Sequence, residues 1–140
     1  MQQALSRASR GFTLLELLVV IVIIGLLAGY VAPRYFSQVG KAEGRMAQAQ
    51  IDALEKALET YRLDVGNYPS SQQGLNALVQ APSGVQRWQG PYLRKAVPLD
   101  PWANAYQYRY PGQRGDYDLW SWGRDGALGG QGEDADIVNW

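Results

Sequence analysis

The sequence predicts an α+β fold, in which a long N-terminal helix packs on a small antiparallel β-sheet and is followed at the C-terminal end by a glycine-rich acidic loop. Three observations predict it. An apolar run over residues 12–33 continues into a stretch whose apolar residues recur at helical spacing to about Leu63. Two alternating segments, residues 105–110 and 117–122, flank a turn. Residues 121–136 combine glycines with carboxylates.

Composition excludes several classes of function. The chain has 140 residues, which suggests one domain, and its 13 basic and 13 acidic residues cancel. The net charge is therefore zero and gives no indication of a nucleic-acid partner. The sequence has no cysteine, so it can form no disulfide and has no thiol chemistry. It also has no histidine, which is the commonest general base and the commonest metal ligand. We expect that the protein is not an enzyme.

Residues 12–33 are predicted to span a membrane. The only charged side chain between Arg10 and Arg34 is Glu16, and a helix over residues 11–33 would be about 35 Å long, against about 30 Å for a hydrocarbon core. A cleaved secretory signal is one alternative, but the run is too long for one and lacks a small-x-small cleavage site. A simple membrane anchor is the other alternative.

Glu16 is the unexpected residue of this run. A lone carboxylate in the bilayer costs a few kcal/mol, and such groups usually have a partner. If the chain were cut between Gly11 and Phe12, the new amine of Phe12 would lie within reach of Glu16 of a neighbouring copy. The hypothesis is that this pair relieves the cost and sets the stagger of adjacent helices, a use that a plain anchor lacks.

The remaining elements follow in order. The amphipathic half of the helix is predicted to end at Gly66–Pro69, with Pro33 removing one hydrogen bond inside it. A short helix over residues 70–78 is expected, with Ser70 or Ser71 as its cap. A proline-rich loop and a hairpin with its turn at Pro111–Gly115 follow. The many Tyr and Trp residues indicate either a carbohydrate or nucleic-acid platform or, as we favour, the core of the sheet.

The stretch Arg10-Gly11-Phe12-Thr13-Leu14-Leu15-Glu16-Leu17 resembles the class III signal of type IV pilins and type II secretion pseudopilins. The resemblance implies that a prepilin peptidase cuts after Gly11 and N-methylates Phe12, and that Glu16 serves assembly. Residues 1–11 would be a leader, residues 12–33 the transmembrane and assembly half of the helix, and residues 34–140 a periplasmic globular domain. Arg7 and Arg10 agree with a cytoplasmic leader.

Later segments extend the resemblance over the whole chain. Leu63–Pro69, Gly90–Leu93 and Pro98–Trp102 resemble the major pseudopilins of type II secretion. This implies a single-pass inner-membrane subunit of a periplasmic pseudopilus, which drives export of folded proteins across the outer membrane. Its partners would be further copies of itself, minor pseudopilins, an inner-membrane assembly platform, the prepilin peptidase and membrane lipid. The alternatives are a type IV pilin, against which the missing cysteines argue, and an anchored binding module that never polymerises.

The C-terminal loop carries the predicted metal site. On composition alone, calcium and a solvated acidic loop both stay open, since calcium takes six to eight oxygens but the EF-hand spacing is absent. The resemblance implies calcium as the cofactor. Its implied ligands are Asp125, then Asp134 or in its place Asp136, with the carbonyls of Trp122 and Gly130.

Overall fold

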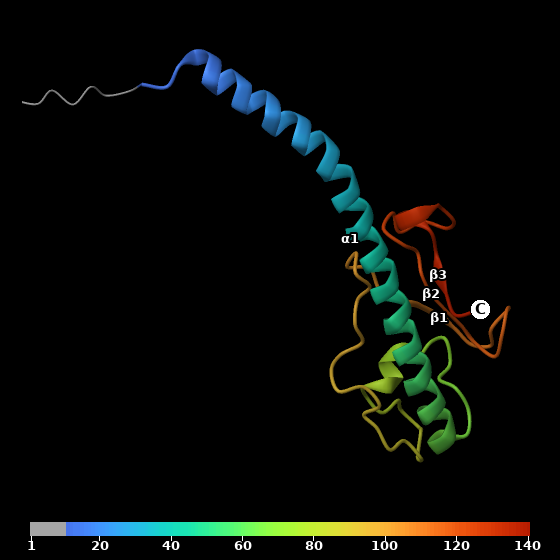
Figure 1. The fold of residues 1–140 in the computed structure, drawn as a ribbon. Helices are drawn as coiled ribbons and strands as arrows, with labels where there is room; N and C mark the ends of the chain where they lie inside the picture. Colours follow the sequence, from blue (N-terminus) through green and yellow to red (C-terminus); the bar gives the residue numbers. More distant parts are fainter. Residues whose placement is uncertain (1–10) are drawn as a thin grey trace, which may run out of the picture. The chain divides into compact units, whose positions relative to one another are not determined.

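The computed structural model describes residues 11–140 and separates two compact units, residues 1–38 and 39–140. The described part of the first unit is a short non-helical lead followed by helix. The second unit holds the remainder of that helix and all of the β-structure (Figure 1).

Helix α1 spans Leu14–Val65 and continues through Pro33. The predicted long helix is thereby confirmed, and its end falls two residues beyond the predicted Leu63. Gly66 ends it in a left-handed conformation (φ 99°) that a side chain would disfavour, and its N–H donates to the Arg62 carbonyl at 2.7 Å.

The core of the second unit is built on one face of α1. Five buried residues recur three or four positions apart along it, as expected for a helix with one covered stripe: Ala47, Ile51, Leu54, Leu58 and Tyr61. The partners come mainly from tyrosines of the later chain, with Tyr106, Tyr117 and the fully buried Leu119. Core packing of the tyrosines is confirmed.

The sheet has three antiparallel strands in the order β1-β2-β3. Strand β1 (Gln107–Arg109) pairs with β2 (Asp118–Ser121), with Tyr108 opposite Leu119. The predicted hairpin is confirmed, although both strands are shorter than expected. Strand β3 (Ile137–Val138) was not predicted, because two residues carry no readable alternation.

The predicted short helix over residues 70–78 is present only in its second part, as a single 3₁₀ turn, η1 (Leu75–Leu78). Ser70 accepts a hydrogen bond from the Gln73 N–H at 3.2 Å and its own N–H donates to Gln73 Oε1 at 2.8 Å, which is a reciprocal cap. Gly74 has φ 58°, so the chain turns there and η1 begins beyond it.

Asp118 fixes the hairpin turn from inside. Its carboxylate is fully buried, and it accepts hydrogen bonds from the backbone N–H groups of Gln113 (2.9 Å) and Arg114 (3.0 Å) and from Arg109 Nε (3.1 Å). Burial raises the pKa of this carboxyl, but the hydrogen bonds from Gln113, Arg109 and Arg114 outweigh burial and leave the pKa below its ordinary value.

Replacing Asp118 by Asn should lower the free energy of unfolding by about 2–4 kcal/mol, because the amide leaves Arg109 and the turn N–H groups without their charged acceptor. Wild-type stability should be fully present above about pH 4 and fall as the pH drops through the folded pKa. Denaturant titrations of the detergent-solubilised protein between pH 2 and 7 measure both effects. Asp116→Asn, at an exposed carboxylate 3.7 Å from Arg62, is the matched control, and an equal loss there would contradict the assignment.

Candidate functional site

The described chain begins at the predicted processing point. Gly11, Phe12 and Thr13 precede α1 without regular structure, and Phe12 is 80% exposed. The bond between Gly11 and Phe12 therefore lies in an exposed segment rather than inside a helix. Residues 1–10 of the predicted leader, with Arg7 and Arg10, lie outside the described residues.

Glu16 caps the helix in which it stands. Its Oε2 accepts from the Thr13 N–H at 2.9 Å and from the Thr13 hydroxyl at 3.0 Å, and the Glu16 N–H donates back to Thr13 Oγ1 at 3.2 Å. This is a capping box, in which an N-cap Thr and an acidic residue three positions later satisfy the free N–H groups of a helix start. Sequence reasoning missed Thr13, although the Thr-x-x-Glu spacing was its signal.

The apolar first part of α1, residues 14–31, has exposed side chains all around the helix within its own unit. It is the one helix among residues 11–140 that is long and apolar enough to cross a membrane. Large residues such as Ile21, Ile24 and Leu26 are more than half exposed. A helix that is apolar all round needs lipid or other helices as its surroundings.

The C-terminal loop places the predicted metal ligands in different environments. Asp125 is exposed, and its Oδ1 accepts from the Ala127 N–H at 3.1 Å. Asp136 Oδ2 accepts from the Gly129 N–H at 2.9 Å, whereas its Oδ1 is buried and has no partner. A buried carboxylate oxygen without a partner is costly, and an ion or water is a common reason for one.

Asp134 is held by a cation of the chain itself. Arg124 donates from Nε to Asp134 Oδ1 at 3.0 Å and from Nη1 to Glu133 Oε2 at 2.5 Å. These two carboxylates raise the pKa of Arg124. Sequence reasoning did not give Arg124 a role, although an arginine inside a stretch of carboxylates was a visible signal.

Two glycines allow the loop to fold tightly on itself. A Cβ on Gly123 would lie 2.8 Å from the Ala135 carbonyl oxygen, and one on Gly130 would collide with the backbone of Asp134. Both glycines have positive φ, at 69° and 89°. The loop thereby packs the backbones of Gly123 and Gly130 against the carbonyl groups of Asp134 and Ala135, but among residues 11–140 no three acidic side chains converge on one point.

The loop also reaches the helix of its own unit. The side chain of Glu133 lies where a Cβ on Gly40 would be, so only glycine permits this contact. Trp102 Nε1 donates to Glu43 Oε2 at 3.0 Å one turn further along α1. Loop and helix are therefore joined at the start of the second unit.

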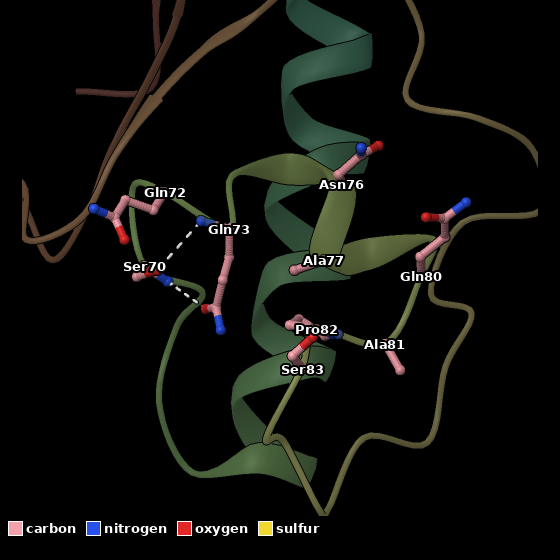
Figure 2. A pocket seen from close by; sticks show the side chains of 9 residues that line it. All are labelled: Ser70, Gln72, Gln73, Asn76, Ala77, Gln80, Ala81, Pro82 and Ser83. Carbon is pink, nitrogen blue, oxygen red and sulfur yellow. Dashed lines mark hydrogen bonds between the residues drawn. The ribbon is translucent and has the colours of Figure 1, made fainter.

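A polar pocket of about 460 Å³ lies beside η1 (Figure 2). Its wall combines amides and hydroxyls with Ala77, Ala81 and Pro82, and Ser70 and Gln73 bond to each other. The side chains of Gln72, Asn76 and Gln80 point in different directions and do not converge (Figure 2). Nothing in this pocket is arranged for chemistry.

Comparison with known proteins gives a consistent result. The family model "Type II secretion system (T2SS), protein G" matches residues 34–140, and the model "Prokaryotic N-terminal methylation motif" matches residues 6–32. The chain is similar to type II secretion system core protein G of Pseudomonas aeruginosa (47% identity, 96% of each chain). The corresponding protein of Vibrio cholerae is 45% identical, covering 96% of this chain and 93% of the other.

A solved structure shares the fold. The crystal structure of the major pseudopilin from the type 2 secretion system of enterohaemorrhagic Escherichia coli superimposes with a TM-score of 0.64 at 37% identity, covering 75% of this chain and 92% of the other. The long helix with a small antiparallel sheet is thus an arrangement already known for that protein.

Proposed function

This chain belongs to the type II secretion system protein G family, the pseudopilins, and we propose from this premise how its residues build the filament. The single observation that carries the function is the family match over residues 34–140, which the N-terminal methylation motif completes. It is a structural subunit rather than an enzyme. The alternative of a type IV pilin for adhesion, motility or DNA uptake is less supported, since the globular part matches protein G.

The apolar half of α1 anchors the subunit in the inner membrane and then forms the axis of a filament. Its apolar side chains are exposed within the described unit. When copies polymerise, the helices of neighbouring subunits pack on these side chains and exclude water from them. The globular unit stands in the periplasm, where minor pseudopilins and an inner-membrane assembly platform are the expected partners. Growth of the filament drives folded proteins across the outer membrane.

Processing prepares the assembly. A prepilin peptidase cuts after Gly11, and Phe12 becomes the methylated first residue. The accessible, non-helical segment at this bond supports cleavage. The freed amine also gives the helix start a positive charge close to the cap of Thr13 and Glu16.

Glu16 then has two available partners. In the described chain it satisfies Thr13. In the filament, its charge is available to the Phe12 amine of a neighbour, because a carboxylate has lone pairs for several donors. The cap holds the carboxylate at the helix end in the monomer, and the neighbour's charge adds attraction in a low dielectric.

Calcium is the proposed cofactor of the C-terminal loop. The buried, unpartnered Asp136 Oδ1 fits a hard cation that prefers oxygen, and Gly123 and Gly130 let the loop fold tightly around it. Asp125 and the carbonyls of Trp122 and Gly130 would complete the ligands. Asp134 is engaged by Arg124, which favours Asp136 over Asp134. When bound, the ion would neutralise the loop and hold its fold.

Processing predicts that the mature protein lacks residues 1–11 and begins with N-methyl-phenylalanine. Gly11→Leu should stay at full precursor length, because the bulky side chain blocks recognition. Mass spectrometry of the intact protein from a host with the peptidase decides this. Gly44→Leu, at a half-buried helix position where an added Cβ would meet nothing within 4 Å, should be processed normally, and a retained leader in the wild type would refute the proposal.

If Glu16 pairs with the Phe12 amine of a neighbouring copy, two substitutions by uncharged residues at the helix start should have different effects on assembly. Glu16→Gln keeps the capping box but removes the charge, and Thr13→Ala removes the cap but keeps the charge. If the charge pairs between copies, Glu16→Gln should reduce filaments and secretion about tenfold or more, while Thr13→Ala assembles. Electron microscopy of filaments and an assay of exported protein measure this. Wild-type filament levels from Glu16→Gln would show that only the cap matters.

If the C-terminal loop binds calcium, the ion should raise the thermal stability of the protein. The purified protein should melt higher in millimolar calcium than in EGTA, by the equivalent of about 2.7 kcal/mol where free calcium exceeds Kd a hundredfold. Asp125→Asn should lose the shift and Asp116→Asn should keep it. Arg124→Ala should enlarge the shift, since Glu133 and Asp134 then lack their internal cation. Equal melting of the wild type in both buffers would leave a solvated acidic loop held by Arg124.

A further inference from the structure

The apolar half of α1 ends in a group of side chains to which the proposed assembly chemistry gives no role. It consists of Tyr30, Arg34, Tyr35 and Phe36, all within the first unit. The three aromatic residues are 63%, 65% and 67% exposed. At about 1.5 Å per residue, Arg34 lies about 30 Å along the helix from Leu14, which is the thickness of a hydrocarbon core. When the apolar run spans a bilayer, this group therefore lies at the level of the lipid headgroups.

The four side chains surround the helix rather than forming one face of it. Successive residues of an α-helix are turned by about 100°, so Tyr30 and Arg34 share one side while Tyr35 and Phe36 point to two others. A folded protein partner contacts one face of a single helix, whereas a lipid layer surrounds the helix completely. Aromatic rings with a polar edge, such as those of tyrosine, are enriched at the membrane–water interface. The arrangement therefore favours lipid over a protein as the partner.

Pro33 places a backbone carbonyl without its helical partner beside this group. Helix α1 continues through Pro33, but proline has no N–H to donate to the carbonyl of Gly29. Such a carbonyl is costly in hydrocarbon, whereas water can satisfy it at the membrane surface. The proline therefore agrees with a membrane boundary at this position.

Arg34 supplies a positive charge that its own unit does not neutralise. Its guanidinium carbon lies 4.8 Å from the centre of the Tyr30 ring, and it makes no ion pair within residues 11–38. The chain has no acidic residue between Glu16 and Glu43. The N–H donors of Arg34 are thus available to an anion, and the planar guanidinium matches the oxygens of a phosphate in pairs.

We propose that Tyr30, Arg34, Tyr35 and Phe36 bind the headgroup of an anionic phospholipid. Arg34 binds the phosphate, and the aromatic rings pack where the headgroups meet the acyl chains. The lipid is anionic because a zwitterionic headgroup carries its own ammonium beside the phosphate, which repels Arg34. The proposal rests on the membrane span of the proposed function, and it gives the unassembled subunit a fixed depth in the bilayer.

The test uses the full chain in neutral dodecyl maltoside micelles. The probes are short-chain phosphatidylglycerol, phosphatidylcholine of the same chain length, and inorganic phosphate. NMR follows the Nε–H signal of Arg34 and the backbone amide signals of Tyr35 and Phe36. Phosphatidylglycerol should shift these signals in a saturable way, and the other two probes should bind more weakly.

Three variants separate this contact from general charge attraction. Arg34→Gln should weaken the binding of phosphatidylglycerol, followed on the two amide signals, about fivefold, which is the effect of one basic residue at an anionic membrane surface. Arg34→Lys keeps the charge but loses the paired donors, so its affinity should lie between those of the wild type and Arg34→Gln. Arg94→Gln removes the same charge from an exposed arginine of the second unit and should leave binding unchanged.

Insertion is measured separately, by flotation of the protein with phosphatidylcholine vesicles after alkaline extraction. The wild type and Arg34→Gln should both stay inserted, because the apolar run is unchanged. Given insertion, the proposal alone is overturned if phosphatidylglycerol gives no saturable shift, if either other probe binds as well, or if Arg34→Gln binds like the wild type. Shifts that follow protein concentration instead of lipid would assign the surface to a second copy and overturn it too. A wild type that does not insert would overturn the membrane span itself, and this proposal with it.

Discussion

One buried stripe of α1 is the constraint on which the rest of the second unit depends. Ile51, Leu54 and Leu58 are essentially inaccessible to solvent, and burial of each such side chain is worth about 1.5–3 kcal/mol. The sheet has only short strands, and a hairpin of three or four residues is not stable alone in water. The tyrosines and Leu119 that meet this stripe therefore hold the hairpin in place, and the loops depend on the hairpin.

The same helix has a different task in its first half, which explains the abrupt change of pattern. From Leu14 to Val31 nearly every residue is apolar, and from Val39 onward polar residues alternate with the buried stripe. A helix satisfies its backbone groups internally in either solvent, so one continuous element serves both. The exception is its start, where four N–H groups lack partners. Thr13 and Glu16 satisfy two of these N–H groups, those of Thr13 and Glu16 themselves. This gives Glu16 a structural use besides its charge.

Local signals explain what could be predicted from the sequence. The long helix follows from spacing, the hairpin from alternation, and the helix end from Gly66. The short helix predicted over residues 70–78 begins only at Leu75, because Gly74 turns the chain, which the apolar pattern around Leu75 does not reveal. Strand β3 is too short to signal itself. Alternation also cannot say which face of β2 is inside, so it could not tell that Leu119 is buried and Trp120 only half-buried.

The ion pairs of the C-terminal loop could not be predicted from its composition. Composition alone gives a cluster of carboxylates that repel one another, and a bound cation is the obvious remedy. The structure adds Arg124, which pairs with Glu133 and Asp134 and removes much of that repulsion from within. Exposed ion pairs contribute little individually, but Glu133 also fills the space above Gly40 on α1. The ion pairs of Arg124 with Glu133 and Asp134 therefore position the loop on the helix. Asp136 Oδ1 is not among the oxygens that Arg124 contacts, and it has no hydrogen-bond partner. A metal ion in this loop would add to a partly ordered structure rather than create it.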